Sequence, residues 1–389
     1  MTKRSPSIDV DLFSDEAIAD PYPLYEEIRN AGAVVWLESY EMWAIGRFDD
    51  VRAALRADTI LLSGRGVAMN DDLNDTGATN SLISDGEEHR RLRKAVMAPM
   101  MPGPLRDVRG RMQELSDELV ERLLAMDDFD GISDFSHHLP VSVVSFLVGL
   151  PEAGRERMLE WAGAAFNALG PMNERARAAL PKLMEAAQYV AGLDRADLPP
   201  DGWAAGIYRA GDEGRIEPDE AKKLVFDYVS PSLDTTILAT GHMLYQLGRN
   251  PEQFEKVKKE RSLVPDAVAE ALRIGSPVRA FTRLADADYE AGEVFVPAGD
   301  RVAILYAAAN HDERHYPDPE VFDIERNAQD HVALGYGVHH CAGAHLARLE
   351  MECLLDALAR KVTAIEVGDP TPFPSNMLSG YASFRASFS

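Results

Sequence analysis

One short segment, 334–343, constrains this chain more than any other feature of its sequence. It reads LGYGVHHCAG, so glycines stand six and four residues before Cys341 and a third stands two residues after it. Positions without side chains let a loop lay its backbone against a flat partner such as a macrocycle. An apolar periodic run from Ala342 to Lys361 predicts that the cysteine opens a helix, where its thiol pKa would be lowered and its thiolate could bind a metal. The alternative is a buried structural cysteine beside a glycine-rich turn.

Length, charge and cysteine content limit the class of protein. The 389 residues contain no linker, repeat or low-complexity tract, so we expect a single domain spanning 1–389. A formal net charge of −24 repels phosphate and argues against a nucleic-acid partner. The polar start and the short apolar stretch Pro140–Pro151 predict neither a targeting signal nor membrane association. Two cysteines make no secreted disulfide framework, so we expect a cytoplasmic protein.

Apolar periodicity predicts a mainly α-helical chain with small β-sheets. The longest candidate helix, Ala221–Arg249, would cross about 43 Å at about 1.5 Å per residue. Residues 62–81 are rich in Gly, Asn and Asp and form the clearest long loop, a kind of segment that is often functional. Cys353 lies among leucines, and we expect it in the core. The other predicted elements are a mostly helical region over 85–193, strands near 34–36 and 42–45, helices over 50–56 and 263–274, and a β-rich region over 289–306.

Five further motifs accompany the cysteine loop. A Glu and an Arg three apart on a helix are common by themselves, but the joint occurrence of these motifs in one order is specific. They are DPYPLY at 20–25, GRFDDV at 46–51, DGEEHRRLR at 85–93, EALR at 270–273, and NHD to PDP at 310–319. With Gly335, Gly337, His339, Cys341 and Gly343, they resemble the cytochromes P450 over nearly the whole chain.

The resemblance implies a fold and a cofactor. The cytochrome P450 fold is mainly α with small β-sheets, and it holds haem b between a long distal helix and a proximal helix that carries the cysteine. Cys341 would be the axial ligand of the iron, and Leu334, Gly335 and Gly343 would lie against the haem. The family usually has Phe where Leu334 stands, so the surroundings of the sulfur would differ modestly.

Charged residues and histidines complete the haem site that the resemblance implies. Haem propionates need cationic or hydrogen-donating partners. The resemblance assigns them to His89, Arg93, Arg283 and His339. Glu270, Arg273 and Arg326 would form a buried structural network that supports the loop.

The segment around Pro231 carries the residues that the resemblance assigns to oxygen activation. Asp234 and Thr235 match the acid–alcohol pair of the family, which delivers protons to dioxygen before the O–O bond breaks. Pro231 and Ser232 stand where small residues usually precede the pair. Because proline lacks an N–H and clashes with the carbonyl four residues earlier, we expect a kink or an opened turn near Asp227. Alternatively, Pro231 ends the helix, with Ser232 as N-cap and Asp234 in the next first turn.

The expected substrate is a small, aromatic organic molecule, hydroxylated or oxidatively O-demethylated. By resemblance, the loop 62–81 and the residues Phe166, Leu233, Val278 and Phe281 would contact it, and Phe281 suits a flat apolar molecule. Terpenes and other compact apolar molecules are the alternative. Arg279 is expected to face a propionate or a polar network, and pairing with a substrate carboxylate is the other possibility.

The resemblance further implies O2 as co-substrate and electrons from NAD(P)H through a reductase and a ferredoxin. The acidic chain would dock this donor through a local basic patch of Arg90, Arg91, Lys94 and Arg348. A peroxide-driven peroxygenase and a haem sensor without enzymatic activity are the competing classes. Neither needs the Asp234–Thr235 pair. The sequence leaves the substrate, the redox partners and the oligomeric state open.

Overall fold

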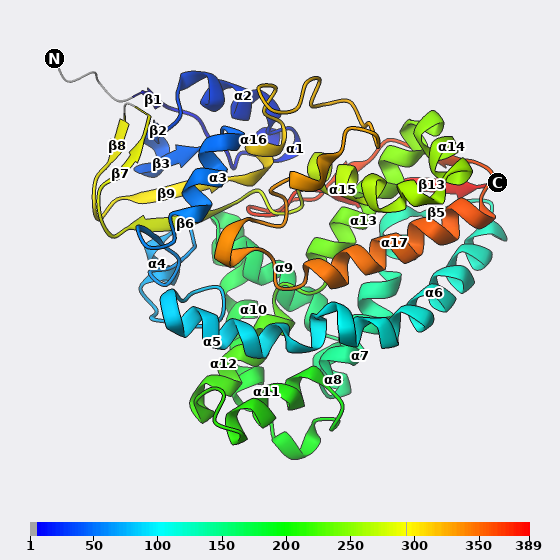
Figure 1. Ribbon diagram of the computed structural model, residues 1–389, viewed down its shortest axis with the longest axis horizontal. Helices are drawn as coiled ribbons and strands as arrows, with labels where there is room; N and C mark the ends of the chain where they lie inside the picture. The colour runs from blue at the N-terminus through cyan, green and yellow to red at the C-terminus, as the bar shows by residue number, and fades with distance from the viewer. Residues whose placement is uncertain (1–5, 293) are drawn as a thin grey trace.

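The computed structural model describes residues 6–292 and 294–389, so Glu293 of the predicted β-rich region lies outside the described residues. The largest sheet and the β7-β8 pair lie at one side of the molecule, the sheet with β5 and β13 lies at the opposite side by the C-terminus, and helices form most of the rest (Figure 1). The fold is mainly helical with small sheets, as predicted. No helix among the described residues has the length and apolar character needed to cross a membrane.

The helices alternate with short connections along most of the chain. They are α1 (Asp15–Ala19), α2 (Tyr22–Ala31), α3 (Phe48–Arg56), α4 (Asp71–Asn74), α5 (Gly86–Met97), α6 (Pro102–Leu124), α7 (Ser145–Val148), α8 (Glu152–Arg155), α9 (Met158–Ala168), α10 (Glu174–Ala191), α11 (Trp203–Asp212), α12 (Pro218–Val229), α13 (Asp234–Arg249), α14 (Pro251–Lys259), α15 (Val264–Gly275), α16 (Tyr306–Asn310) and α17 (Ala344–Lys361).

The largest sheet has the strand order β1-β2-β3-β9-β6-β4. Its strand β3 reads MWAI with every residue buried, and it pairs in parallel with β9, which aligns Ala44 with Ala303. The prediction of a strand over 42–45 is therefore confirmed. The strands are β1 (Ser7–Ile8), β2 (Val35–Leu37), β3 (Met42–Ile45), β4 (Leu61–Leu62), β5 (Phe129–Asp130), β6 (Ala280–Ala285), β7 (Tyr289–Ala291), β8 (Val294–Val296), β9 (Arg301–Leu305), β10 (Ile365–Val367), β11 (Thr371–Pro372), β12 (Tyr381–Ser383) and β13 (Arg385–Phe388).

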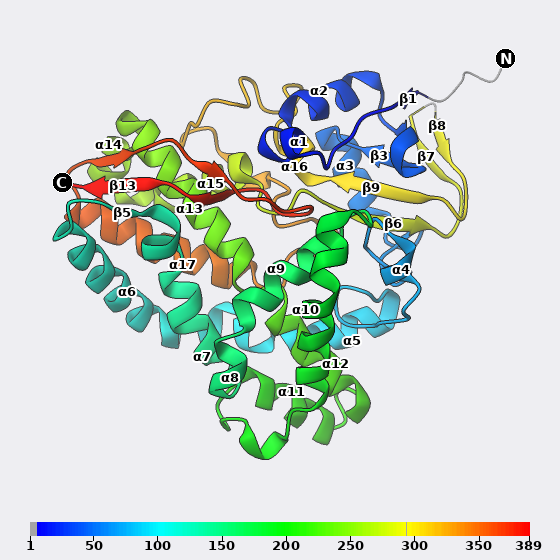
Figure 2. The same ribbon diagram turned by 180° about the vertical axis from the view of Figure 1, so that it is seen from behind.

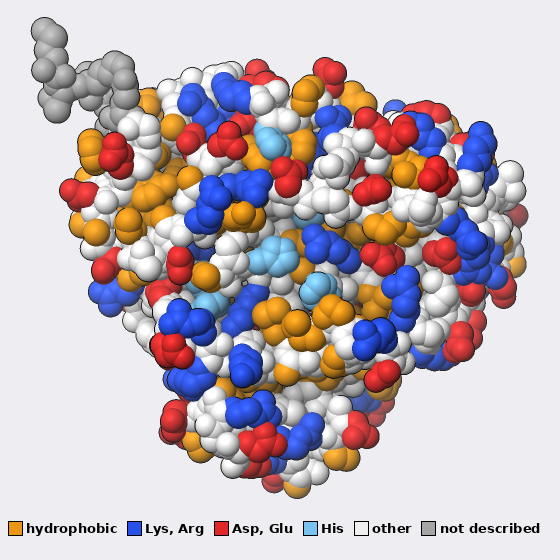
Figure 3. Space-filling view, in the orientation of Figure 1, with side chains coloured by type: hydrophobic (Ala, Val, Ile, Leu, Met, Phe, Trp, Pro, Cys, Tyr) orange, Lys and Arg blue, Asp and Glu red, His pale blue; other side chains and the backbone are white. Residues whose placement is uncertain are grey.

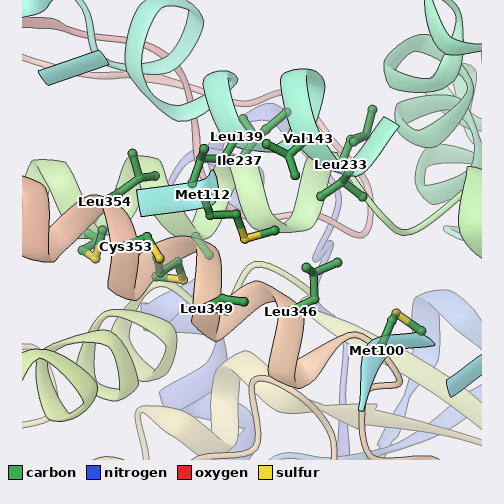
Figure 4. Packing of buried hydrophobic residues seen from close by; sticks show 14 of the residues in the cluster. Met100, Met112, Leu139, Val143, Leu233, Ile237, Leu346, Leu349, Cys353 and Leu354 are labelled. Atoms are coloured by element: carbon green, nitrogen blue, oxygen red, sulfur yellow. The ribbon is translucent and has the colours of Figure 1, made fainter. Parts of the chain in front are cut away.

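The main apolar core lies among the long helices. Helix α17 is in front of α13 in Figure 1 and behind it in Figure 2, so the two form opposite layers. Met112 of α6, Ile237 of α13 and Leu349 of α17 pack against one another in this core (Figure 4). Cys353 is fully buried in the same cluster, which confirms its predicted place in the core.

The prediction of one continuous helix over Ala221–Arg249 is wrong. Helix α12 ends at Val229, four non-helical residues follow, and α13 begins at Asp234. Pro231 supplies no N–H for the carbonyl of Asp227, so the helical hydrogen bonding stops there. Asp234 does open the second helix, but its N-cap is Leu233, whose side chain makes no capping bond, and not Ser232.

Candidate active site

The loop around Cys341 is closed by its own backbone. The N–H of Cys341 donates to the carbonyl of Leu334 at 2.7 Å. Gly335 and Gly337 have φ angles of 69° and 72°, which favour glycine, and a Cβ on Gly337 would lie 2.5 Å from the carbonyl oxygen of Leu55. The glycines are therefore required by backbone conformation and by close approach to α3. Leu334 itself packs against the main core.

The helix after the cysteine begins later than predicted. Its first residue is Ala344, its N-cap is Gly343, and Cys341 stands in the preceding turn. Enclosure by protein atoms raises the pKa of the thiol, although the N–H of Gly343 and the charges of Arg93 and Arg348 oppose this effect. The lowered pKa expected from the sequence is therefore wrong for the protein alone. A bound metal cation reverses the balance, because a coordinating thiol is deprotonated.

The four residues assigned to the propionates lie around the cysteine. His89 and Arg93 come from α5, Arg283 comes from β6, and His339 lies in the cysteine loop. The rings of His89 and His339 are 4.0 Å apart between centroids. The charge of Arg283 acts on His339, and the charge of Arg93 interacts with Cys341. Elements distant in the sequence thus bring all four to one place.

The hydrogen bonding of Arg93, Arg283 and His339 fits a ligand that carries carboxylates, whereas both ring nitrogens of His89 already lie 2.9 and 3.1 Å from main-chain carbonyls. Both ring nitrogens of His339 are buried without a hydrogen-bond partner, although Nε2 lies 3.8 Å from Oδ1 of Asp85. Arg93 donates to the sulfur of Met97 at 3.2 Å, and Arg283 donates to the carbonyl of Thr282 at 2.7 Å. Within the part of the chain that the structure describes, neither arginine forms an ion pair. Propionates would satisfy these donors and charges.

The break before α13 places the acid–alcohol pair at the start of a helix. Thr235 donates its hydroxyl to the carbonyl of Pro231 at 3.0 Å, and Ser232 donates to the carbonyl of Tyr228. Asp234 is buried, and its Oδ2 has no hydrogen-bond partner. Burial raises the pKa of Asp234 to about 7. This carboxyl can therefore gain and lose a proton near neutral pH.

Three of the four predicted substrate residues lie together. Phe166 of α9, Val278 and Phe281 belong to one apolar cluster, which also contains Leu238, one turn beyond Thr235 on α13. Leu233 belongs to the main core instead, where Figure 4 shows it next to Val143.

Part of the loop 62–81 reaches the same region. It contains the short helix α4, and Met69 of this loop belongs to the cluster of Phe166. The N–H of Met69 donates to the carbonyl of Leu169 at 2.8 Å, and Thr282 donates its N–H to Val67 at 2.9 Å. These bonds fasten the loop to the end of α9 and to β6.

Arg279 lies in a polar network, which is one of the two placements expected from the sequence. Its guanidinium donates to the carbonyls of Leu378 (2.9 Å) and Ile18 (2.7 Å) and is buried. These bonds hold Nε and Nη2 in the protein interior, while the buried Nη1 has no hydrogen-bond partner.

The structural network is formed as expected. Arg273 donates two hydrogen bonds of 2.7 and 2.8 Å to Glu270, and both side chains are fully buried. Arg326 adds a bond of 3.2 Å to the same carboxylate. Arg273 also donates to the carbonyl of Asn310 at 2.8 Å, so the network ties α15 to α16.

The predicted basic patch is only partly free. Arg90 pairs with Glu87 on its own helix, and Arg91 makes a two-pronged ion pair with Glu220 of α12. Lys94 is exposed. Figure 3 shows histidines near the middle of this face with Lys and Arg side chains around them.

One acidic residue escaped the sequence reasoning. Asp227 of α12 accepts the N–H of Ser81 at 3.0 Å, at the end of the long loop. The signal was a single acid in the apolar run 224–229, LVFDYV.

Comparisons with known proteins point to one family. A family model described as Cytochrome P450 matches residues 204–378. Cytochrome P450 CYP199A2 of Rhodopseudomonas palustris is 36% identical over 370 residues, which cover 94% of this chain and 90% of that protein. The 6-deoxyerythronolide B hydroxylase of Saccharopolyspora erythraea is 29% identical, over 92% of each. The crystal structure of CYP108D1 of Novosphingobium aromaticivorans matches with a TM-score of 0.84 and 28% identity, over 96% of both chains.

Fold, cysteine loop and relatives together define a haem-dependent oxygenase. The chain belongs to the cytochrome P450 family. It is a P450 monooxygenase, an oxidoreductase that incorporates oxygen from O2, and its cofactor is haem b.

Proposed function

We propose that this single-domain enzyme hydroxylates or O-demethylates a small, flat, largely apolar organic substrate, with aromatic molecules preferred. The observation that carries the proposal is the cluster of Phe166, Val278 and Phe281 beside α13, which offers aromatic and branched apolar surface. Nε and Nη2 of Arg279 are bound to main-chain carbonyls, which leaves only the buried Nη1 for a carboxylate, so we favour a neutral molecule. Compact terpenes are the second candidate, since they fit the same apolar cluster.

The chain holds its cofactor through residues of the cysteine loop, α5 and β6. Cys341 ligates the iron, Gly335 and Gly343 let the loop backbone approach the ring, and His89, Arg93, Arg283 and His339 bind the propionates. The unpartnered nitrogens of His339 support this assignment. Haem b supplies the iron at which dioxygen binds and is reduced.

Asp234 and Thr235 manage protons. Asp234, half protonated near pH 7, gives a proton toward the distal side and regains one from water at the opened segment 230–233. Thr235 turns its hydroxyl from Pro231 toward the same place and limits the loss of reducing equivalents as peroxide. This pair favours a monooxygenase over a peroxygenase or a sensor.

We place the enzyme in the cytoplasm, where its two free cysteines stay reduced, and propose a ferredoxin as its electron donor. Lys94, which is exposed on α5, and Arg348, whose charge acts on Cys341, support a docking face for an acidic donor.

A panel of neutral aromatic ethers, the matching benzoates and compact terpenes tests the substrate class. The readout is the low-spin to high-spin change of the haem, followed by product formation with NAD(P)H, ferredoxin and reductase. Tight binding of the neutral ethers supports the proposal. A preference for benzoates or terpenes overturns the substrate class, and product formed only from peroxide overturns the monooxygenase route.

A further inference from the structure

Asp227 is the one acid on the inner side of α12 that neither the cofactor set nor the acid–alcohol pair uses. It lies two residues before the end of α12, and its partly buried carboxylate accepts the main-chain N–H of Ser81 at 3.0 Å. Ser81 is 5% exposed, so this N–H cannot turn to water for its partner. The bond joins two segments 146 residues apart in the chain.

The same peptide segment is held from its other side. The carbonyl of Ser81 lies 2.9 Å from Nδ1 of His89, whose Nε2 lies 3.1 Å from the carbonyl of Val338 in the cysteine loop. Ser81 is therefore clamped between α12 and α5. On the loop side, Lys223 adds a weaker, exposed bond of 3.4 Å to the hydroxyl of Thr79.

Enclosing the ionised Asp227 carboxylate costs free energy, which indicates that its hydrogen bond to Ser81 has a role in the folded protein. Enclosure raises the pKa of Asp227 to about 6, and the Ser81 hydrogen bonds and the positive charge of Arg93 only partly offset this effect. The neighbours Leu224, Val225 and Val229 are buried and apolar, so a leucine at this position would suit the helix alone.

The break at Pro231 separates this clamp from the rest of the distal helix. Because segment 230–233 is not helical, the last turn of α12 is not locked to α13 by main-chain hydrogen bonds. The contacts that fix this last turn include the bond to Ser81 and the bond of the Tyr228 hydroxyl to the carbonyl of Val96 on α5 at 2.7 Å, whereas the ion pair of Glu220 with Arg91 holds the first turn of α12.

We propose that Asp227 is a positioning residue that latches the end of the loop 62–81 over the distal side of the site, so that ligand access requires this hydrogen bond to open. The inference rests on the proposed function of this loop as a substrate-contacting segment. A hydrogen bond to a charged group is strong enough to change the opening equilibrium by about tenfold or more.

The test compares three variants of the haem-loaded enzyme with 4-phenylimidazole, an aromatic ligand of haem iron, as the probe. Asp227→Leu removes the acceptor, and Asp227→Asn keeps an oxygen that can accept the same N–H. Glu220→Gln is the control, because it weakens a contact of the same helix with α5. The latch predicts about tenfold faster binding and release of the probe in Asp227→Leu, rates within about twofold of wild type in Asp227→Asn, and unchanged rates in Glu220→Gln.

Wild-type rates in a folded Asp227→Leu enzyme, or equal acceleration in Glu220→Gln, overturn the latch. Hydrogen exchange of the wild-type protein tests it without any variant. The Ser81 amide should exchange at least tenfold more slowly than the amides of residues 76–78, and equal exchange refutes the proposal. Either failure leaves the proposed function standing, since that depends on the spectrum and products of the wild-type enzyme.

Discussion

The hydroxyl of Thr235 donates a 3.0 Å hydrogen bond to the carbonyl of Pro231, across the break between α12 and α13. The carbonyl lacks a regular helical partner because the chain is not helical there, and a side chain takes that place. In this structure the hydroxyl proposed for oxygen activation is therefore bonded to the carbonyl of the proline that interrupts the helix.

Replacing Thr235 with alanine should therefore uncouple the enzyme. We expect peroxide released per NAD(P)H consumed to rise, and product per NAD(P)H to fall by about tenfold, since one hydrogen bond near the reacting oxygen is lost. Thr235→Ser should restore most of the coupling. Thr236→Ala, the same change at the next, buried residue, is the control. Unchanged coupling in Thr235→Ala would show that the alcohol has another role.

The pH dependence of stability should report Asp234. Burial raises its pKa from 3.8 to about 7, so the folded state favours the neutral carboxyl. This contribution is fully present below about pH 4 and is lost as pH rises through 7, because the unfolded chain ionises first. Relative to Asp234→Asn, wild type should lose on the order of 2–4 kcal/mol between pH 4 and 8. Urea unfolding of the ferric enzyme measures the free energy of unfolding at each pH. If this free energy changed with pH in the same way in wild type and Asp234→Asn, the raised pKa would be ruled out.

The fold and the proximal loop could be read from the sequence because local patterns determine them. Gly335 and Gly337 adopt the left-handed conformation that their residue type indicates, and the strand Met42–Ile45 follows from its apolar run. The start of α17 was missed by two residues, because a turn after Cys341 has no sequence pattern of its own.

The distal side could be read less well because tertiary contacts decide it. A proline such as Pro231 either kinks or ends a helix, and the sequence does not choose between the two. The bonds of Asp227 to Ser81 and of Arg91 to Glu220 join residues more than 120 positions apart. Only the folded chain shows them.

Breaking the Glu270–Arg273 pair should be strongly destabilising. Arg273→Ala leaves the Glu270 carboxylate buried with Arg326 as its remaining cation, and we expect a loss of about 3–5 kcal/mol in the free energy of unfolding. Arg360→Ala, which breaks partly exposed pairs with Asp117 and Asp356, should cost less than about 1 kcal/mol. Denaturant titration measures both losses. Similar losses in the two variants would contradict the claim that the buried pair matters more for stability than the exposed one.

Electron transfer should depend on the face that carries α5. Lys94→Glu should slow reduction by a ferredoxin by about tenfold at low ionic strength, and salt should shrink the difference. Arg177→Glu changes an exposed charge on α10, which Figure 2 shows on the opposite side, and should leave the rate unaltered. Stopped-flow reduction at two salt concentrations decides between specific docking and a general charge effect.

The spectrum of the reduced enzyme with carbon monoxide tests the central claim most directly. If Cys341 is the axial thiolate, wild type and Cys353→Ala give the strongly red-shifted Soret band of a thiolate-ligated haem, because Cys353 is buried in the core away from the loop. Cys341→Ser must lose that band. A wild-type band at the position of a histidine-ligated haem, or a red-shifted band that survives in Cys341→Ser, would contradict the assignment.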